Sequence, residues 1–370
     1  MNSWAPTPAK RAAPAGRRPK FLLLLLALGV GVVLFGMHMI TLFSGSADAL
    51  GGLGQWRWGS STSRPPGFLQ HDMTDEELLW RASFVPQVKE YYPFWRVPKI
   101  AFMFLSRGPL PLRPLWDRFF TGHEGLYTIY VHSQHPHYWA DYPPSSPFYG
   151  RQVPSQVTEW GEITLCDAER RLLANALLDI SNEWFVLLSD SCIPLFSFNY
   201  IYNYLRRTNL SYVQVYDLPG KDGRGRYSPG MAPEVDIARW RKGSQWFEVQ
   251  RDIAVAIVAD VKFYPKFREF CKPDCYPDEH YLPTMLSMEV PHLLANRSIT
   301  WVDWTRRPAS HPGTFGMAEV NETFLRRIKK MKTCHYSNQS SSPCFLFARK
   351  FTPSSLQALL QLAPKVLGFG

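Results

Sequence analysis

The sequence has little charge and lacks several common catalytic loops. Charged residues make up 19% of its 370 residues and aromatic residues 15%, a composition that argues against a disordered chain. It has no Gly-x-Ser-x-Gly nucleophile elbow and no phosphate-binding Gly-x4-Gly-Lys-[Ser/Thr] loop. These absences argue against a serine hydrolase and a P-loop sulfotransferase. Asp-x-Asp is also absent, and we find no internal repeat.

The positive charge is concentrated at the N-terminus. The formal net charge is +10, and the rest of the chain has 36 basic against 31 acidic residues, a net charge of +5. This weak excess does not predict nucleic-acid binding, but it is compatible with a small anionic substrate. The other half comes from five basic residues within the first twenty, where there is no acid: Lys10, Arg11, Arg17, Arg18 and Lys20.

Residues 21–43 form a long apolar run in which His38 is the one titratable group. At 1.5 Å per residue, a helix of this length spans a hydrocarbon core of about 30 Å. The basic residues before it predict a cytosolic tail (1–20), a signal anchor (21–43) and a luminal remainder, which is a single-pass type II topology. A cleaved signal peptide is the alternative, because Ala47-Asp48-Ala49 resembles a cleavage site.

Two features suit a luminal domain. Six cysteines all follow the apolar run, and an even number in an oxidising compartment predicts disulfides. Zinc binding is the alternative, although no histidine pair at finger spacing accompanies the cysteines. There are also four N-x-[ST] glycosylation sequons, at Asn209, Asn296, Asn321 and Asn338.

Residues 44–95 are rich in Gly, Ser and Pro and are predicted to form a stem, with a short helix after Thr74. Residues 96–370 are predicted to form one α/β domain, a mostly parallel sheet with helices on both faces. Thr164-x-x-Asp167 has the form of a capping box for a helix over 168–180. The predicted strands are 100–105, 126–132, 184–188 and 211–215, and the other predicted helices are 112–121 and 198–206.

Four later segments combine aromatic and charged residues and carry a family resemblance. In order, they are Gly-Ser-Gln-Trp-Phe (243–247), Pro-Asp-Glu-His-Tyr (277–281), Trp-Val-Asp-Trp-x-Arg (301–306) and Phe-Ala-Arg-Lys-Phe (347–351). Together they resemble the core-2/I-branching β-1,6-N-acetylglucosaminyltransferase family (glycosyltransferase family 14), in its plant branch. The resemblance implies a GT-A type fold, a Golgi membrane location and inverting transfer from a UDP-sugar to a glycan or glycoprotein acceptor. No metal or other cofactor is expected.

Glu279 corresponds to the family's catalytic base. Inverting transfer needs a carboxylate that takes the proton of the attacking hydroxyl. From the residues alone, Asp278 and Glu279 would equally well favour the start of a helix after Pro277.

Cations are expected to meet the negative charge of the leaving nucleoside diphosphate in place of a metal. Lys350 matches the family lysine of the Phe-Ala-x-Lys-Phe motif. Arg306 is the first choice for the diphosphate-binding arginine, followed by Arg307 and Arg327. The alternative is that these side chains are solvated surface charges. Glu234-x-Asp236 is the nearest substitute for Asp-x-Asp in the predicted domain.

The remaining candidates concern the nucleoside and the acceptor. His132 and Asp190 end two predicted strands, where ligands bind in such sheets, and are predicted to contact the nucleoside. Animal relatives have an acid where this chain has His132. Four aromatic and cationic residues are predicted to line the acceptor site: Trp246, Arg239, Lys242 and Trp304. An ordinary core position for the tryptophans is an equally good interpretation. A catalytically inactive sugar-binding protein on the same fold is the alternative function.

Overall fold

The computed structural model describes residues 69–86, 92–305, 311–331, 333–336, 339–341 and 343–370. The described residues belong to a unit that begins at Pro65. Within these ranges no helix combines the length and the apolar character needed to cross a bilayer. The predicted tail (1–20) and anchor (21–43) lie outside the described residues.

The central sheet has four strands in the order β2-β1-β3-β5. Its first three strands are parallel, and Phe102 in β1 pairs with Ile129 in β2 and with Val186 in β3. The fourth strand is short and antiparallel to β3. This arrangement confirms the predicted mostly parallel sheet. The strand bounds are β1 (Lys99–Ser106), β2 (Tyr127–Ser133), β3 (Asn182–Ser189) and β5 (Glu248–Gln250).

Alternate residues of β1 build two separate hydrophobic cores, because successive strand side chains point to opposite faces. Phe102 and Phe104 enter one core, and Ala101 and Met103 enter the other. The Phe102 ring lies edge-on to Phe120 with centroids 5.0 Å apart. Full burial of one such side chain contributes about 2–3 kcal/mol to stability.

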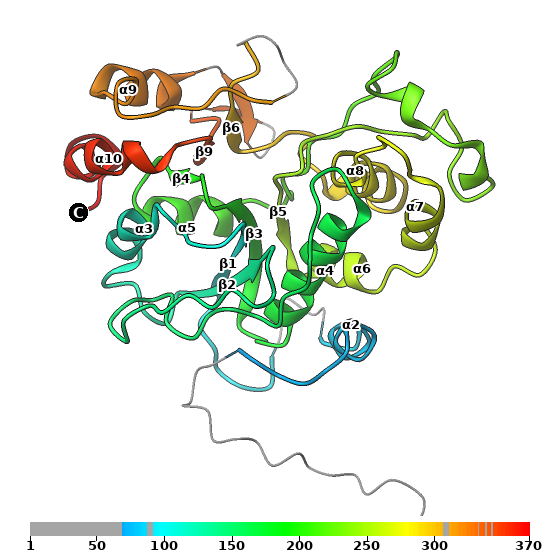
Figure 1. The fold of residues 1–370 in the computed structure, drawn as a ribbon, viewed down its shortest axis with the longest axis horizontal. Coiled ribbons are helices and arrows are strands. Elements are labelled where there is room, and N and C mark those ends of the chain that lie inside the picture. The colour runs from blue at the N-terminus through cyan, green and yellow to red at the C-terminus, as the bar shows by residue number, and fades with distance from the viewer. Residues whose placement is uncertain (1–68, 87–91, 306–310, 332, 337–338, 342) are drawn as a thin grey trace, which may run out of the picture. The chain divides into compact units, whose positions relative to one another are not determined.

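Helices cover both faces of the sheet, as predicted (Figure 1). On the first face lie α3 (Arg113–Phe120), α5 (Phe198–Arg206) and α10 (Leu356–Leu362). Phe324 of α9 (Glu322–Lys330) joins the same core beside Trp301. On the second lie α2 (Asp75–Ser83), α4 (Ile163–Leu177), α6 (Arg251–Val258), α7 (Tyr264–Phe270) and α8 (Pro277–Glu289). Shorter turns span Arg224–Arg226, Pro229–Met231, Pro291–Leu293, Pro353–Ser355 and Ala363–Leu367.

A second, smaller sheet brings the C-terminal segments to the end of the first. Its order is β4-β9-β6, with β4 (Ile193–Pro194), β9 (Phe347–Arg349) and β6 (Thr300–Val302). The Phe351 N–H donates to the Ser191 carbonyl at 2.9 Å, which joins the end of β9 to the turn after β3. This junction places Lys350 near Asp190.

Disulfides link Cys271 to Cys275 and Cys334 to Cys344, and Cys166 and Cys192 are free and buried. Cys334 is the first residue of β7 (Cys334–Tyr336), which pairs with β8 (Gln339–Ser341). Disulfides, rather than zinc ligation, therefore use four of the six cysteines.

Three sequence-based predictions need correction. Residues 211–215 form no strand, because β5 occupies the position beside β3 in the sheet. Tyr212 contacts β5 only through a single bridge to Glu248. The capping box is wrong because α4 already begins at Ile163. The hydroxyl of Thr164 instead accepts from the Glu159 N–H, and Asp167 pairs with Arg268.

The third correction concerns the stem predicted for 44–95, which overlaps the compact unit. The expected helix after Thr74 is present as α2, and the Thr74 hydroxyl accepts from the Glu77 N–H. Leu78 and Ala82 bury its apolar face in the second core, so α2 is part of the globular domain.

Candidate active site

A cavity of about 1550 Å³ opens where the parallel strands end. Leu105 and Ser106 of β1, His132 of β2 and Ser189 of β3 lie in its wall. Open α/β sheets bind ligands at the carboxyl ends of their strands, and this cavity lies at that edge. Charged side chains of both signs line it: Arg107, Asp190, Lys221, Asp222, Arg226, Lys242, Asp278, Glu279, Arg297, Arg349 and Lys350.

Glu279 lies in the first turn of α8, with its side chain 26% exposed to the cavity. Its Oε2 forms ion pairs with Lys242 and, at 3.1 Å, with Arg226. Tyr276, which precedes the helix, adopts a left-handed conformation with φ of 56°. The turn therefore holds a carboxylate at the cavity between two cations, and water or substrate can still reach it.

The residues beside Glu279 are buried. Asp278 lines the cavity, and burial together with the charge of Glu279 raises the pKa of Asp278 to about 7. Burial lowers the pKa of His280 to about 3, so this imidazole is neutral. His280 Nδ1 contacts the Arg241 carbonyl at 2.8 Å, and its ring stacks on Trp240. These contacts fix the start of α8 in the second core.

Three cations meet where β1 and β9 end. Burial, and then the charges of Arg349 and Arg107, lower the pKa of Lys350 to about 8. Burial also lowers the pKa of Arg349, whose guanidinium lies 4.1 Å from the centroid of the Trp246 ring. Arg107 follows β1, and its N–H donates to Asp190 at 3.5 Å. The arrangement is suited to a multiply charged anion.

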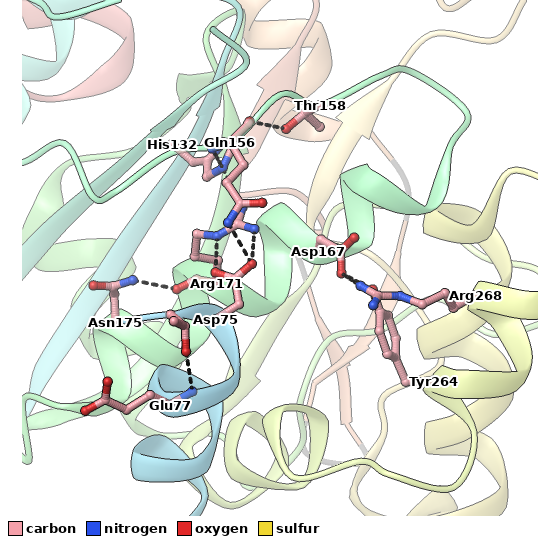
Figure 2. A network of polar contacts seen from close by, with 11 residues as sticks. Asp75, Glu77, His132, Gln156, Thr158, Asp167, Arg171, Asn175, Tyr264 and Arg268 are labelled. Carbon is pink, nitrogen blue, oxygen red and sulfur yellow. Dashed lines mark hydrogen bonds and ion pairs between the residues drawn. The ribbon is translucent and has the colours of Figure 1, made fainter. Parts of the chain in front are cut away.

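His132 is held as a neutral acceptor by a polar network that reaches α2 (Figure 2). Its Nε2 accepts from Arg171 at 2.8 Å and from the Gln156 N–H at 3.2 Å. Burial, and then the charge of Arg171, lower the pKa of His132 to about 3. Burial alone would raise the pKa of Asp75, but the hydrogen bonds and the charge of Arg171 have the larger effect, so the pKa of Asp75 is lowered. Because Nε2 accepts, the proton of His132 is on Nδ1.

The four predicted acceptor residues are not all together. Lys242 and Trp304 line the cavity, and Trp304 is 52% exposed. Trp246 also borders it, but its ring is buried and covered by Arg349. Arg239 is not among the lining residues and pairs with Asp236 at 3.6 Å.

Other predicted residues lie elsewhere. Arg306, Arg307 and Asn338 are outside the described residues. Asn209, Asn296 and Asn321 are exposed, and Asn321 caps α9 by accepting from the Phe324 N–H. Glu234, the alternative metal ligand, instead pairs with Lys266 at 3.0 Å. Across the described ranges, no three His, Cys, Asp or Glu side chains converge as metal ligands.

The cavity wall also contains residues that sequence reasoning did not name as site candidates, among them Arg107, Arg226 and Trp160. Arg107 follows β1 just as Asp190 follows β3, so the strand-end rule would have found it. Arg226 ends the short turn Arg224–Arg226, and only its contact with Glu279 reveals it. Trp160 precedes α4 and is an exposed aromatic residue with no local signal in the sequence.

An α/β domain that brings a carboxylate and several cations to its strand ends is suited to an enzyme that transfers a group from an anionic donor. The family model for Core-2/I-Branching enzyme matches residues 100–329. The chain is also 35% identical over 308 residues to Glycosyltransferase BC10 of Oryza sativa subsp. japonica, an alignment that covers 72% of this chain and 76% of the rice protein. The chain therefore belongs to the Core-2/I-Branching enzyme family and is a glycosyltransferase.

This membership confirms the resemblance seen in the sequence motifs, and the mixed α/β architecture fits a GT-A type fold. A glycosyltransferase takes a nucleotide-sugar donor and a glycan acceptor.

Proposed function

We propose that this glycosyltransferase inverts the anomeric centre and works without a metal. It would transfer N-acetylglucosamine from its UDP donor to a hydroxyl of a glycan or glycoprotein, in a β linkage. One observation carries the proposal: Glu279 and the cations Arg349 and Lys350 line one cavity at the strand ends.

In the proposed reaction the acceptor hydroxyl attacks the anomeric carbon from the face opposite the diphosphate. Glu279 takes the hydroxyl proton, a new C–O bond forms, and the bond to the diphosphate oxygen breaks. The electron pair leaves with UDP, whose added negative charge is met by Lys350 and Arg349. A donor in the α configuration then gives a β product.

The ion pairs of Glu279 are compatible with this role. Lys242 and Arg226 favour the charged carboxylate, which is the form that accepts a proton. The same cations are candidates to contact acceptor hydroxyls, as predicted for Lys242. His132 Nδ1–H and Asp190 are proposed to contact the nucleoside, and Arg306 or Arg307 to assist Lys350.

Donor turnover by the purified protein tests the proposal. UDP release and product linkage would be measured with a panel of UDP-sugars and saccharide acceptors, in EDTA and again with manganese. We expect a β-linked N-acetylglucosamine product whose rate is unchanged by EDTA. Loss of activity in EDTA with recovery in manganese would contradict the cationic mechanism. Sugar binding without turnover of any donor would identify an inactive binding protein.

We further propose a Golgi location with residues 21–43 as the anchor and the enzyme domain in the lumen. The apolar run and the basic tail before it support this topology. Protease added to sealed microsomes should leave the large domain intact, and its digestion would contradict the assignment.

A further inference from the structure

Trp160 is a large aromatic side chain that the fold leaves open at the cavity. It is 59% exposed, lines the cavity and lies in the loop before α4. Tyr276 and His311 flank it, with ring centroids 5.1 and 5.0 Å away. A single exposed tryptophan needs no explanation, but here three rings lie together at one edge of the cavity, and such grouped aromatic surface marks binding sites.

The loop that carries Trp160 is held in place. The Glu159 N–H donates to the Thr164 hydroxyl at 2.9 Å, and the Glu162 N–H donates to the Glu159 carbonyl at 3.3 Å. Gly161 has φ of +84°, and a Cβ there would lie 3.2 Å from the Tyr276 ring. A side chain at 161 would therefore be strained and would crowd Tyr276, so the close approach of the loop requires glycine.

The same Tyr276 ring connects Trp160 to the proposed base. The guanidinium of Arg226 lies 4.2 Å from the Tyr276 centroid and donates to Glu279 at 3.1 Å. A sugar whose hydroxyl reaches Glu279 therefore lies close to this aromatic edge. Further sugars of the same chain would extend over Trp160 toward solvent.

We propose that Trp160, with Tyr276 and His311, forms a carbohydrate-binding platform for the acceptor, outside the position where transfer occurs. The proposal rests on the proposed roles of Glu279 and the cavity. The apolar C–H face of a sugar ring covers an indole, while its hydroxyl groups remain available to polar neighbours such as Glu159 and Glu162, both exposed. The preferred acceptor is thus an oligosaccharide rather than a single sugar.

Kinetics on Trp160→Ala, Trp160→Phe and the control Trp80→Ala test this platform. Trp80 is matched in type and exposure, at 63%, but lies on α2 and does not line the cavity. We expect Trp160→Ala to raise KM for an oligosaccharide acceptor about tenfold. KM for the donor, donor hydrolysis and KM for a monosaccharide acceptor should stay unchanged. Trp160→Phe should recover most of the loss, and Trp80→Ala should match the wild type.

Binding of the same proteins to a printed glycan array separates the platform from catalysis. Loss of array binding in Trp160→Ala alone would support the platform even if the wild type transferred no sugar, in which case the proposed function fails and the platform stands. The platform would be contradicted if wild type and Trp160→Ala bound the array equally, or if Trp80→Ala lost as much binding as Trp160→Ala. It would also be contradicted if the wild type bound no glycan.

Discussion

Replacing Glu279 by glutamine tests the proposed chemistry most directly. Glutamine keeps the size of the side chain and its hydrogen-bonding oxygen, but it cannot take a proton from the acceptor. Loss of a general base lowers kcat by about 10²–10⁴-fold, which corresponds to about 3–5 kcal/mol in the activation barrier. The donor KM should change little, because the base acts on the acceptor hydroxyl.

The ion pairs of Glu279 also determine how much stability the Glu279→Gln change costs. Glu279 pairs with Lys242 and Arg226, whose side chains are 12% and 15% exposed, so the variant removes a carboxylate from two largely buried cations, of which Arg226 keeps its 3.7 Å pair with Asp222. Loss of such charged hydrogen bonds costs about 2 kcal/mol. A domain stable by about 5–15 kcal/mol remains folded after this loss. A large fall in kcat would therefore report chemistry rather than unfolding.

Glu289→Gln is the matched control, because it makes the same change at the other end of α8. Glu289 pairs with Lys262 at 3.2 Å, and both side chains are well exposed, so kcat and stability should stay near the wild type. Steady-state kinetics and circular dichroism on the three proteins make the comparison. A folded Glu279→Gln enzyme with kcat within roughly tenfold of the wild type would remove Glu279 from the mechanism.

Three further predictions concern Lys350 and Asp278, the cavity groups whose pKa values are shifted. Lys350→Ala should lower kcat about 10²–10³-fold and weaken donor binding, because the removed charge meets both the bound and the departing diphosphate. Because the pKa of Lys350 is about 8, wild-type kcat/KM should fall as pH rises above 8, and Lys350→Arg should move this fall to higher pH in a pH–rate profile. Folded Asp278, with a pKa of about 7, keeps a proton that the unfolded chain releases near pH 4, so this group lowers stability as pH rises between these values. Between pH 5 and 7, Asp278→Asn should therefore gain about 2 kcal/mol in unfolding free energy relative to the wild type, measured by urea denaturation, and an unchanged difference would show that Asp278 is ionised throughout.

The elements that sequence reasoning predicted well are those fixed by local or strongly periodic signals. The apolar runs of β1, β2 and β3 are buried on both faces, which leaves few alternatives to a parallel sheet. Thr74 and the acids after it form the start of α2 from adjacent residues alone. Residues 211–215 have the composition of a strand, but the position beside β3 belongs to β5, more than thirty residues later in the chain.

In the other cases, contacts with residues far away in the sequence determine the structure, and local signals do not reveal them. Asp167 resembles a capping residue, yet it pairs with Arg268, 101 residues away. Arg226 and Trp160 acquire their places only when the chain brings them to Tyr276. Sequence reasoning predicted Glu279, Lys242 and Lys350 as candidate residues. It did not predict the other cations and the rings near them, such as Arg226 and Tyr276.

The connection between two of the motifs explains why they are informative together. A Cβ at Gly243 would lie 1.8 Å from the Gln214 carbonyl oxygen, so only glycine allows this approach of the two backbones. There the Gly243 N–H donates to the Glu279 carbonyl at 2.9 Å, and Lys242, one residue earlier, reaches the Glu279 carboxylate. The glycine of one motif thus positions both the carboxylate of the other and its cation. A larger residue at 243 would separate them, and a carboxylate after Pro277 would then be no more than the start of a helix.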